Sequence, residues 1–339
     1  MEKTRRGRGR TTTMQDVARL AGVSIMTVSN VYQQPGRVHQ ATRERVLQAG
    51  LALNYVPNRA ASELASGRSN AIAAIVPFIR NSSFSRTIEG LEERAWHHGF
   101  ELLLAVADSP EREARAIRNL IGRRPDGIVL TGAEHSKEAA DVLLESGIPV
   151  VETWTVEASR FEMTVGSSLY QAAFDVTQRL LGRGYRRIGY IGHDVPVSRR
   201  FSERQRGFEA ALHEAGLPAA GICQVSTASG FAGGSGALEA LLSQTPDLQA
   251  VLCVTDVVAA GVMFECMRRG WAIPERLAVA GYGDFEIAAE IPPGLTTIKT
   301  RGYEIGARAA DLLAEHINQG HVAMAHVDVG YEIVERGSI

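Results

Sequence analysis

The sequence predicts an all-α helix-turn-helix head followed by an α/β core in which two parallel sheets are flanked by helices. Apolar residues recur at helical spacing in three short segments before residue 54. From residue 71 onward, β-rich apolar runs alternate with helical patterns, which is typical of parallel sheets covered on both faces. Charge changes at the same boundary, because residues 1–69 carry 11 Lys or Arg and 4 Asp or Glu (net +7), whereas the rest of this −2 chain carries −9.

The basic head indicates a nucleic-acid partner that the overall charge hides. Part of that charge lies in the tract KTRRGRGR at residues 3–10, which is too polar and Gly-rich to fold alone. This tail is either a solubilising segment or an arm for the minor groove of DNA, and the sequence leaves both open.

The first helix of the head begins at a predicted cap. Thr13 and Asp16 have the spacing of a capping box, and Asp16 also complements the helix dipole. Gly22 is expected to end this helix. Its inward face is expected to carry Val17, Leu20 and Ala21.

Two further helices complete the head. Ser24 is expected to cap a helix over residues 25–32, and a third helix is expected over residues 41–53, followed by Asn54 in a left-handed conformation. Because AGVS joins the first two helices with a small residue and a glycine at the bend, they form a helix-turn-helix. The inward residues are expected to be Val23, Val28, Val31, Val46, Ala49 and Leu53.

The start of the second helix is the predicted recognition surface, since the N-terminal residues of such a helix touch base edges in the major groove. Asn30 suits an adenine, and Ile25 and Met26 suit thymine methyl groups. The alternative is that Ile25 and Met26 belong to the core of the head. The residues expected nearest the phosphates are Ser24, Thr27, Ser29 and Arg43.

Residues 57–67 predict a separate helix of about two turns between Pro57 and Gly67. A helix this short is marginal in water, so we expect it to form only when two copies meet on DNA. Leu64 then serves as an apolar wedge in the minor groove. The alternative is an inert linker, which would not need Leu64 among small residues.

The ordered pattern DVARLAGVS…TVS…V…TRERV…LNY-PNRAASELASG closely resembles the LacI/GalR family of bacterial transcription regulators. The resemblance implies that Leu64 is an intercalating residue of a hinge helix. Two features depart from the family: Ile25, Met26 and Asn30 stand where polar residues are common, and His39 stands where a serine cap is usual. The hinge residues that the resemblance places beside Leu64 on DNA are Tyr55, Asn58, Arg59 and Ala61.

The core is predicted to contain alternating strands and helices. Strands are expected over residues 71–77, 100–106, 127–131, 149–153, 187–192, 222–225, 250–254, 277–282 and 326–334. Helices are expected over residues 84–98, 111–122, 137–146, 170–183, 202–215, 234–242, 257–269 and 303–319.

This core resembles the two-lobed, periplasmic-binding-protein-like core of the same family. The resemblance implies chain crossings between the lobes near residues 166–168, 297–300 and 323–326. The expected domains are a tail (1–12), a DNA-binding head (13–56), a hinge (57–69) and an effector-binding and dimerisation core (70–339). Within the core, one lobe is expected over 70–166 and 299–323, and the other over 168–297 and 326–339.

Ligands of such sheets bind beyond the carboxyl ends of the strands, where a wall aromatic with flanking polar groups suits a polyhydroxylated ligand. Arg204 matches the family's effector-binding arginine, which stands before a Gly-aromatic pair, here Gly207-Phe208. Asp256 matches an aspartate that often bonds structurally, so Thr255 is an equal candidate. The strand-end residues expected in the cleft are Phe78, Arg80, Asn81, Phe84, Thr131, Glu134, His135, Trp154, Arg199, Arg200, Arg204, Thr255, Asp256, Gly283 and Asp284.

An acidic effector is the preferred expectation. Many sugar-binding relatives carry an aspartate where this chain has Gly283. Removing that carboxylate while keeping Arg204, and adding Arg80 and His135, shifts the cleft toward binding an anion. The segments LTGAEHS, GIPVVE and TDVVAAG look most like the gluconate-operon repressor branch, which implies gluconate, a ketogluconate or a phosphorylated form. A neutral sugar or a purine is the alternative.

The sequence carries no Walker loop, GxGxxG, GxSxG or HExxH motif, so neither an enzyme nor a cofactor is expected. Gly233–Gly236 opens a helix and is either a phosphate loop or, preferably, a flexible loop. Three cysteines without metal-ligand spacing indicate buried thiols. With no signal peptide and no apolar run of ~18 residues, we expect a cytoplasmic protein without a membrane span, located at the nucleoid when bound to DNA.

Together these features predict a homodimeric repressor that reads a near-palindromic double-stranded operator and releases it when a sugar acid binds. No heptad tail follows the last predicted strand, so a dimer is expected rather than a tetramer. The alternatives are the same scaffold with a corepressor or acting as an activator, and, from another class, a sugar-acid enzyme or binding protein.

Overall fold

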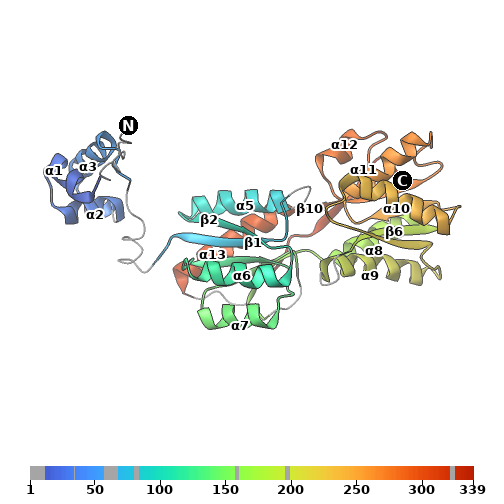
Figure 1. Cartoon of the computed structure of the whole chain (residues 1–339), viewed down its shortest axis with the longest axis horizontal. Helices are drawn as coiled ribbons and strands as arrows, with labels where there is room; N and C mark the ends of the chain where they lie inside the picture. The colour runs from blue at the N-terminus through green and yellow to red at the C-terminus, as the bar shows by residue number, and fades with distance from the viewer. Residues whose placement is uncertain are drawn as a thin grey trace, which may run out of the picture. The chain divides into compact units, whose positions relative to one another are not determined.

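The computed structural model describes residues 12–33, 35–56, 68–79, 84–156, 160–194, 199–320 and 325–339. The chain divides into two compact units, Met1–Ser69 and Asn70–Ile339. In Figure 1 the first unit carries the labels α1–α3, and the second carries all labels from β1 onward. The expected hinge helix at residues 57–67 lies outside the described residues.

The head contains the three predicted helices, α1 (Met14–Ala21), α2 (Ile25–Gln33) and α3 (Gln40–Ala52), with a short 3-10 turn η1 (Pro35–Arg37). The capping box of Thr13 and Asp16 is confirmed, and Gly22 ends α1 with φ 65°. Asn54 follows α3 with φ 47°, and the Tyr55 amide donates to the Gly50 carbonyl at 2.8 Å, so the predicted left-handed stop is also confirmed.

The prediction is wrong for one residue of the head core. Leu20 is 56% exposed, whereas Ala18 is buried between Val17 and Ala21. The inward stripe of α1 is therefore narrower than its apolar residues suggest. His39, where a serine cap is usual, makes no side-chain cap bond to α3.

The first sheet of the core has the order β11-β5-β4-β3-β1-β2, and its strands are parallel. One apolar cluster joins it to α5 and α13, and another joins it to α6 and α7. Its strands are β1 (Ala71–Val76), β2 (Glu101–Val106), β3 (Gly127–Thr131), β4 (Val150–Thr153), β5 (Met163–Gly166) and β11 (Ala325–Asp328). Its helices are α5 (Phe84–His97), α6 (Pro110–Ile121), α7 (Lys137–Ser146) and α13 (Gly302–Gln319).

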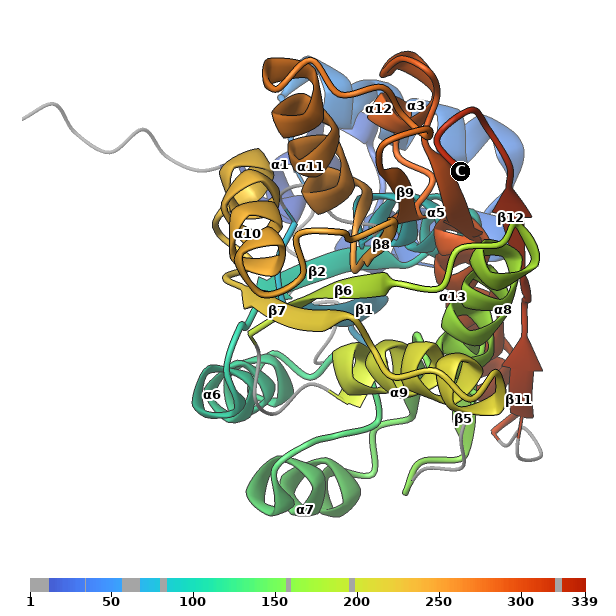
Figure 2. The ribbon, with the colours of Figure 1, turned by 90° about the vertical axis from the view of Figure 1, so that its right-hand side faces the viewer.

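The second sheet has the order β12-β10-β9-β8-β6-β7, and only β12 runs antiparallel to its neighbour. Figure 2 shows α8 and α9 on one face of this sheet and α10 and α11 on the other, each pair with its own apolar cluster. Its strands are β6 (Ile188–His193), β7 (Gly221–Val225), β8 (Ala250–Cys253), β9 (Ala278–Gly283), β10 (Thr296–Thr300) and β12 (Tyr331–Val334). Its helices are α8 (Leu169–Gly182), α9 (Arg199–Glu214), α10 (Gly230–Gln244), α11 (Asp256–Arg268) and α12 (Glu286–Glu290).

The predicted two-sheet fold is confirmed, but the single strand expected over residues 326–334 is wrong. Residues 325–328 pair with β5 in the first sheet, and residues 331–334 pair with β10 in the second. The Gly330 amide donates to Asp328 Oδ1 at 2.8 Å, and Gly330 has φ 69°. The chain therefore changes lobe at residues 329–330, which contradicts the crossing expected near 323–326 and places 326–328 in the first lobe.

Sequence reasoning missed β5, β10 and α12. In β10, Thr296 and Thr297 are fully buried, and their hydroxyls donate to the Arg336 carbonyl and to Asp256. Those partners are 40 and 41 residues away along the chain. Because a buried hydroxyl is tolerated only with its partner in place, nothing local identifies this polar segment as a core strand.

Helices α5 and α13 approach each other closely because glycine stands at each contact. A Cβ added to Gly306 would overlap the Thr87 carbonyl oxygen, and a Cβ added to Gly90 would overlap the Tyr303 carbonyl oxygen. Gly236 in α10 differs, because nothing lies within 4 Å of an added Cβ there.

We predict that Gly306→Ala lowers the free energy of unfolding by roughly 1–3 kcal/mol, because overpacking forces the two helices apart. Gly236→Ala is the matched control and should raise stability by about 0.5–1 kcal/mol, since alanine is the better helix former. Urea unfolding can be followed by tryptophan fluorescence. This signal reports on residues 70–339, because all three tryptophans of the chain, Trp96, Trp154 and Trp271, lie there. Equal stability of the two variants would contradict the close α5–α13 contact.

Candidate functional site

The start of α2 presents apolar side chains to solvent. Ile25 is 49% exposed and Met26 is 70% exposed, while Val28 and Val31 fill the buried side of the same helix. This exposure contradicts the alternative in which Ile25 and Met26 belong to the core of the head. The two side chains are available to a partner surface.

The polar residues of this surface are partly engaged. Ser24 caps α2 by accepting from the Thr27 amide at 3.1 Å, and the two hydroxyls lie 2.9 Å apart. Tyr55 lies against Tyr32, with ring centroids 5.7 Å apart, so its ring belongs to the head. Ser29, Asn30 and Arg43 are partly exposed. The DNA-binding candidates Asn58, Arg59, Ala61 and Leu64 lie outside the described residues, as do Arg80 and Asn81 of the cleft.

In the core, three predicted cleft aromatics come together. The Phe84 ring centroid lies 5.3 Å from both Phe78 and Trp154, in edge-to-face geometry. Phe78 also packs against the apolar clusters of both lobes. Trp154 has φ 65° and is 2% exposed, and its indole N–H has no hydrogen-bond acceptor among the described residues. This cluster therefore forms an aromatic wall with one unused donor.

Arg204 is buried without a counter-charge. Its side chain extends from α9, the residue is 7% exposed, and Nη1 donates to the Val254 carbonyl at 2.9 Å. The guanidinium carbon lies 3.7 Å from the ring centroid of Tyr282, a cation–π contact. Within the described ranges, no carboxylate pairs with Arg204, and its Nε–H has no acceptor. The helix neighbours Arg199 and Arg200 have no described side chains.

Asp256 is a structural residue in this arrangement. It is fully buried, and it accepts from the Phe285 amide at 2.7 Å and from the Thr297 hydroxyl. Burial raises the pKa of the carboxyl to about 6, and these hydrogen bonds oppose the rise. Both carboxylate oxygens are therefore used within the lobe. Thr255 caps α11 through the Val258 amide and stays partly exposed.

Gly283 leaves no room for a side chain. It has φ 135°, and an added Cβ would lie 2.5 Å from the Phe285 ring. An aspartate at this position would therefore require the Phe285 ring or the backbone to move. The next residue, Asp284, is paired with Arg336 at 2.7 Å. Thr131 donates to the Ile75 carbonyl at 3.0 Å, and Glu134 is exposed.

The expectation that His135 adds positive charge to the cleft is wrong. Its side chain is 3% exposed, and its ring nitrogens lie 3.0 Å from Glu113 and 3.2 Å from Glu152. Burial lowers the pKa of the imidazole, but the hydrogen bonds to both glutamates outweigh burial and raise it to about 9. The charge of His135 is thus balanced inside the first lobe.

Sequence reasoning missed His193, which ends β6 beside the arginine. Its Nδ1 lies 3.2 Å from the Val225 carbonyl, and its ring centroid lies 5.1 Å from that of Phe201, which also contacts Arg204. Burial and, to a smaller extent, the charge of Arg204 lower the pKa of His193 to about 4, although the hydrogen bond to Val225 opposes the change. The hydrogen bond places the proton on Nδ1, so Nε2 is an acceptor. Its position at the end of a strand was the signal that could have identified it.

Two hollows are lined by residues of both lobes. The larger, of about 1020 Å³, lies at the β10–α13 connection and is lined by Gly283 and Asp284 together with Arg86, Lys299 and Arg301. The smaller is lined by Trp154 and Glu203, with Ser167 and Ser168 at the first crossing. Only the larger hollow has the volume for a sugar-sized ligand, and Trp154 of the aromatic wall lines the smaller one.

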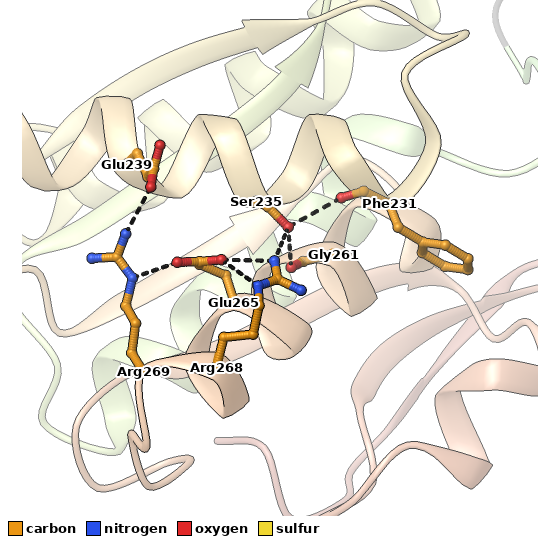
Figure 3. A network of polar contacts seen from close by, with 7 residues as sticks. All are labelled: Phe231, Ser235, Glu239, Gly261, Glu265, Arg268 and Arg269. Atoms are coloured by element: carbon orange, nitrogen blue, oxygen red, sulfur yellow. Dashed lines mark hydrogen bonds and ion pairs between the residues drawn. The ribbon is translucent and has the colours of Figure 1, made fainter.

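Helices α10 and α11 are joined by a network of ion pairs and hydrogen bonds (Figure 3). Glu265 makes ion pairs with Arg268 at 2.7 Å and with Arg269 at 2.6 Å, and Arg269 reaches Glu239 on α10 at 3.1 Å. The Ser235 hydroxyl accepts from Arg268 and donates to the Gly261 carbonyl. Phe231 and Met267, on the same two helices, are 46% and 44% exposed.

The first lobe has a comparable apolar surface at the edge strand β2. Leu104 and Val106 are each 40% exposed, and Trp96 on α5 is 69% exposed. Exposed apolar side chains on an edge strand favour pairing with another chain. Both lobes therefore carry surfaces that suit a protein partner.

Within the described ranges, no helix is long and apolar enough to cross a membrane. The same residues hold no group of three or more metal-ligating side chains. Cys253 and Cys266 are buried free thiols, whereas Cys223 is only half-buried, so the expectation of buried thiols is confirmed for two of the three.

Comparison with known proteins agrees with this geometry. Residues 13–58 match the family model described as bacterial regulatory proteins, lacI family, and residues 177–339 match the periplasmic binding protein-like domain. The HTH-type transcriptional regulator GntR of Escherichia coli K12 is 31% identical over 96% of this chain and 98% of its own length. The regulator GntR of Pseudomonas aeruginosa PAO1 is 34% identical over 99% and 98%. A LacI-family regulator from Silicibacter pomeroyi superposes with a TM-score of 0.88 at 32% identity, covering 96% of this chain and 99% of that one.

We predict that the His135 ion-pair cluster makes core stability fall between about pH 6.5 and 9. The folded-state pKa of about 9 lies above the unfolded value, so the stabilisation is complete below pH 6.5 and is lost as pH rises through 9. The loss should reach up to about 3 kcal/mol. Urea unfolding across this range should show that His135→Gln is flatter than the wild type, while His193→Gln keeps the wild-type alkaline slope. An unchanged slope in His135→Gln would contradict the assigned charge.

Proposed function

This chain belongs to the lacI family of bacterial regulatory proteins, and we propose that it is a dimeric transcriptional repressor whose affinity for its operator falls when a small sugar acid binds. Its relatives are DNA-binding transcriptional regulators, and the chain is one of them rather than an enzyme. The observation that carries the sugar-acid assignment is the buried Arg204 without a counter-charge.

The proposed division of labour follows the two units of the chain. Residues 13–56 form the DNA-binding head, residues 57–69 form the hinge, and residues 70–339 form the effector-binding and dimerisation core. The compact units Met1–Ser69 and Asn70–Ile339 support a boundary at the end of the hinge.

Base readout is assigned to the exposed start of α2. Ile25 and Met26 offer apolar contacts for thymine methyl groups, and Asn30 offers a bidentate amide for adenine. Leu64 is assigned the wedge in the minor groove. The phosphate contacts are assigned to Ser24, Thr27, Ser29 and Arg43, and further hinge contacts to Tyr55, Asn58, Arg59 and Ala61.

Arg204 is assigned the acid group of the effector. Burying a guanidinium without a counter-charge is costly, and an incoming carboxylate or phosphate removes that cost through charge-assisted hydrogen bonds. A neutral sugar offers no such compensation. The positive φ of Gly283 and the neighbouring Phe285 ring disfavour a carboxylate side chain that would accept from sugar hydroxyls there, which supports the same preference.

The particular acid is assigned from the resemblance to the gluconate-operon repressor branch. LTGAEHS and TDVVAAG carry that resemblance, and two regulators named GntR are similar over nearly the whole chain. The proposed effector is gluconate, a ketogluconate or a phosphorylated gluconate. The aromatic wall of Phe78, Phe84 and Trp154 suits the carbon face of such a polyol.

A homodimer is proposed as the unit that reads a near-palindromic operator, because a twofold protein matches a twofold site. The exposed apolar residues of β2 and α5, and those of α10 and α11, support it, since each lobe then contributes to the subunit contact. An effector with higher affinity for one lobe arrangement shifts the population toward that arrangement and thereby weakens the hold on DNA.

We predict that Leu64→Ala weakens operator binding by roughly tenfold or more, because the kinked duplex loses its wedge. Gluconate binding measured by calorimetry should stay unchanged, since the core is intact. Leu144→Ala is the matched control, because Leu144 is 53% exposed on α7 and far along the chain from the head. A gel shift in which both variants bind the operator as tightly as the wild type would reject the wedge.

We predict that Arg204→Ala leaves operator binding intact and abolishes release by gluconate in the same gel shift. Arg206→Ala is the control on the same helix, since the Arg206 side chain is 61% exposed and paired with Glu203. That variant should respond to gluconate as the wild type does. If gluconate instead tightens wild-type binding to the operator, the ligand is a corepressor and the proposed sign of control is wrong.

A further inference from the structure

Three buried polar atoms of Arg204 and two tyrosines lack a hydrogen-bond partner among the described residues. They are Arg204 Nε, the Tyr190 hydroxyl and the Tyr282 hydroxyl, and none has a hydrogen-bond acceptor in the part of the chain that the structure describes. Tyr190 is 1% exposed and Tyr282 is 2% exposed, so solvent does not supply the missing partners. Buried polar groups are normally satisfied, and each exception calls for an explanation.

The two tyrosines come from neighbouring positions on one face of the second sheet. Tyr190 on β6 pairs in register with Leu252, which pairs with Ala280, and Tyr282 stands two residues further along β9 on that same face. Both belong to the apolar cluster beneath α8 and α9. Arg204 reaches down from α9 onto the Tyr282 ring and bonds to the Val254 carbonyl just beyond the end of β8.

All three groups are hydrogen-bond donors in the states that they adopt. Burial raises the pKa of both phenols above the ordinary value, so each keeps its O–H at neutral pH. Arg204 and Tyr282 both act on the pKa of Tyr190, which shows that the three groups share one electrostatic environment. The site thus has two O–H donors and one N–H donor without a bonded acceptor among the described residues, beside a positive charge.

We propose that Tyr190 and Tyr282 determine the specificity of this regulator for an acid. This inference rests on the proposed function and deepens it. The matching ligand group carries several acceptor atoms, no donors and a negative charge, which describes a carboxylate or a phosphate dianion. The Tyr282 ring holds the guanidinium flat, and the two hydroxyls complete the set of donors around the acid oxygens.

A sugar hydroxyl suits this site less well than an acid group, because it carries an O–H donor and the site already has more donors than acceptors. Because none of the three atoms reaches solvent, an acid group arrives only after a neighbouring side chain has moved. Phe201 is such a neighbour, with its ring centroid 5.6 Å from the guanidinium carbon of Arg204. Binding of the acid is thereby linked to a rearrangement at the start of α9.

The test compares Tyr190→Phe, Tyr282→Phe and the double variant with the wild-type full-length protein. Calorimetry with D-gluconate and with D-glucose measures affinity, and thermal unfolding without ligand measures stability. Each single variant should lose about three- to tenfold in gluconate affinity, with no matching loss for glucose. The unfolding temperature without ligand should stay equal or rise, because removing an unsatisfied donor removes its burial cost.

Tyr331→Phe is the matched control in the same lobe. Its hydroxyl is satisfied, since it donates to Asp175 at 2.6 Å. This variant should unfold at a lower temperature and bind gluconate as the wild type does. Loss of gluconate affinity without loss of stability indicates a hydroxyl that binds the ligand. Loss of stability without loss of affinity, as expected for Tyr331→Phe, indicates a hydroxyl that stabilises the fold.

Wild-type gluconate affinity in both Tyr190→Phe and Tyr282→Phe overturns the inference, whatever the unfolding temperature, because the hydroxyls are then satisfied within the protein, for example by a buried water. A loss of affinity shared equally by Tyr331→Phe overturns it as well. If the wild-type protein gives no heat with gluconate, 2-ketogluconate or 6-phosphogluconate, the proposed effector class itself fails, which distinguishes that outcome from one confined to the tyrosine variants.

Discussion

The rest of the second lobe is built around one buried guanidinium, Arg204, which has no opposing charge among the described residues. Arg204 retains one hydrogen bond to the Val254 carbonyl and the face of Tyr282, and neither neutralises it. Burying this charge therefore costs free energy in the free protein. Under the proposed function, a bound anion would offset that cost, which gives the second lobe a physical means of responding to a small acid.

The way in which the lobes are connected determines how that response spreads. The chain passes between them three times, near residues 167–168, 301 and 329–330, and the hollows and the aromatic wall lie beside the first two passages. Within each lobe, by contrast, helices are locked together by glycine contacts such as Gly306 against Thr87 and Gly261 against Phe231. Rigid lobes with a few connecting segments favour movement of whole bodies rather than gradual deformation.

Sequence reasoning succeeded where the signal was local. Capping by Thr13, the left-handed Asn54 and the alternation of strands and helices all follow from nearby residues, and the structure confirms them. It failed where the deciding partner lies far along the chain. His135 looks like a cleft cation until Glu113 and Glu152 are brought against it, and β10 looks too polar to be buried until Asp256 and Arg336 meet its threonines. Tyr190 resembles an ordinary core residue in the sequence, but its buried hydroxyl has no partner among the residues that the structure describes.

The separation of β11 from β12 has a consequence for how this protein is made. The last described residues supply the outermost strand of both sheets, β11 for the first and β12 for the second. Neither lobe is formed by one continuous stretch of the chain, so neither completes its sheet until residues 325–334 have been synthesised. Until then β5 and β10 each lack one neighbouring strand, and unpaired strand edges of this kind favour contact with other nascent chains. A truncation before residue 325 would therefore remove an edge strand from both sheets at once.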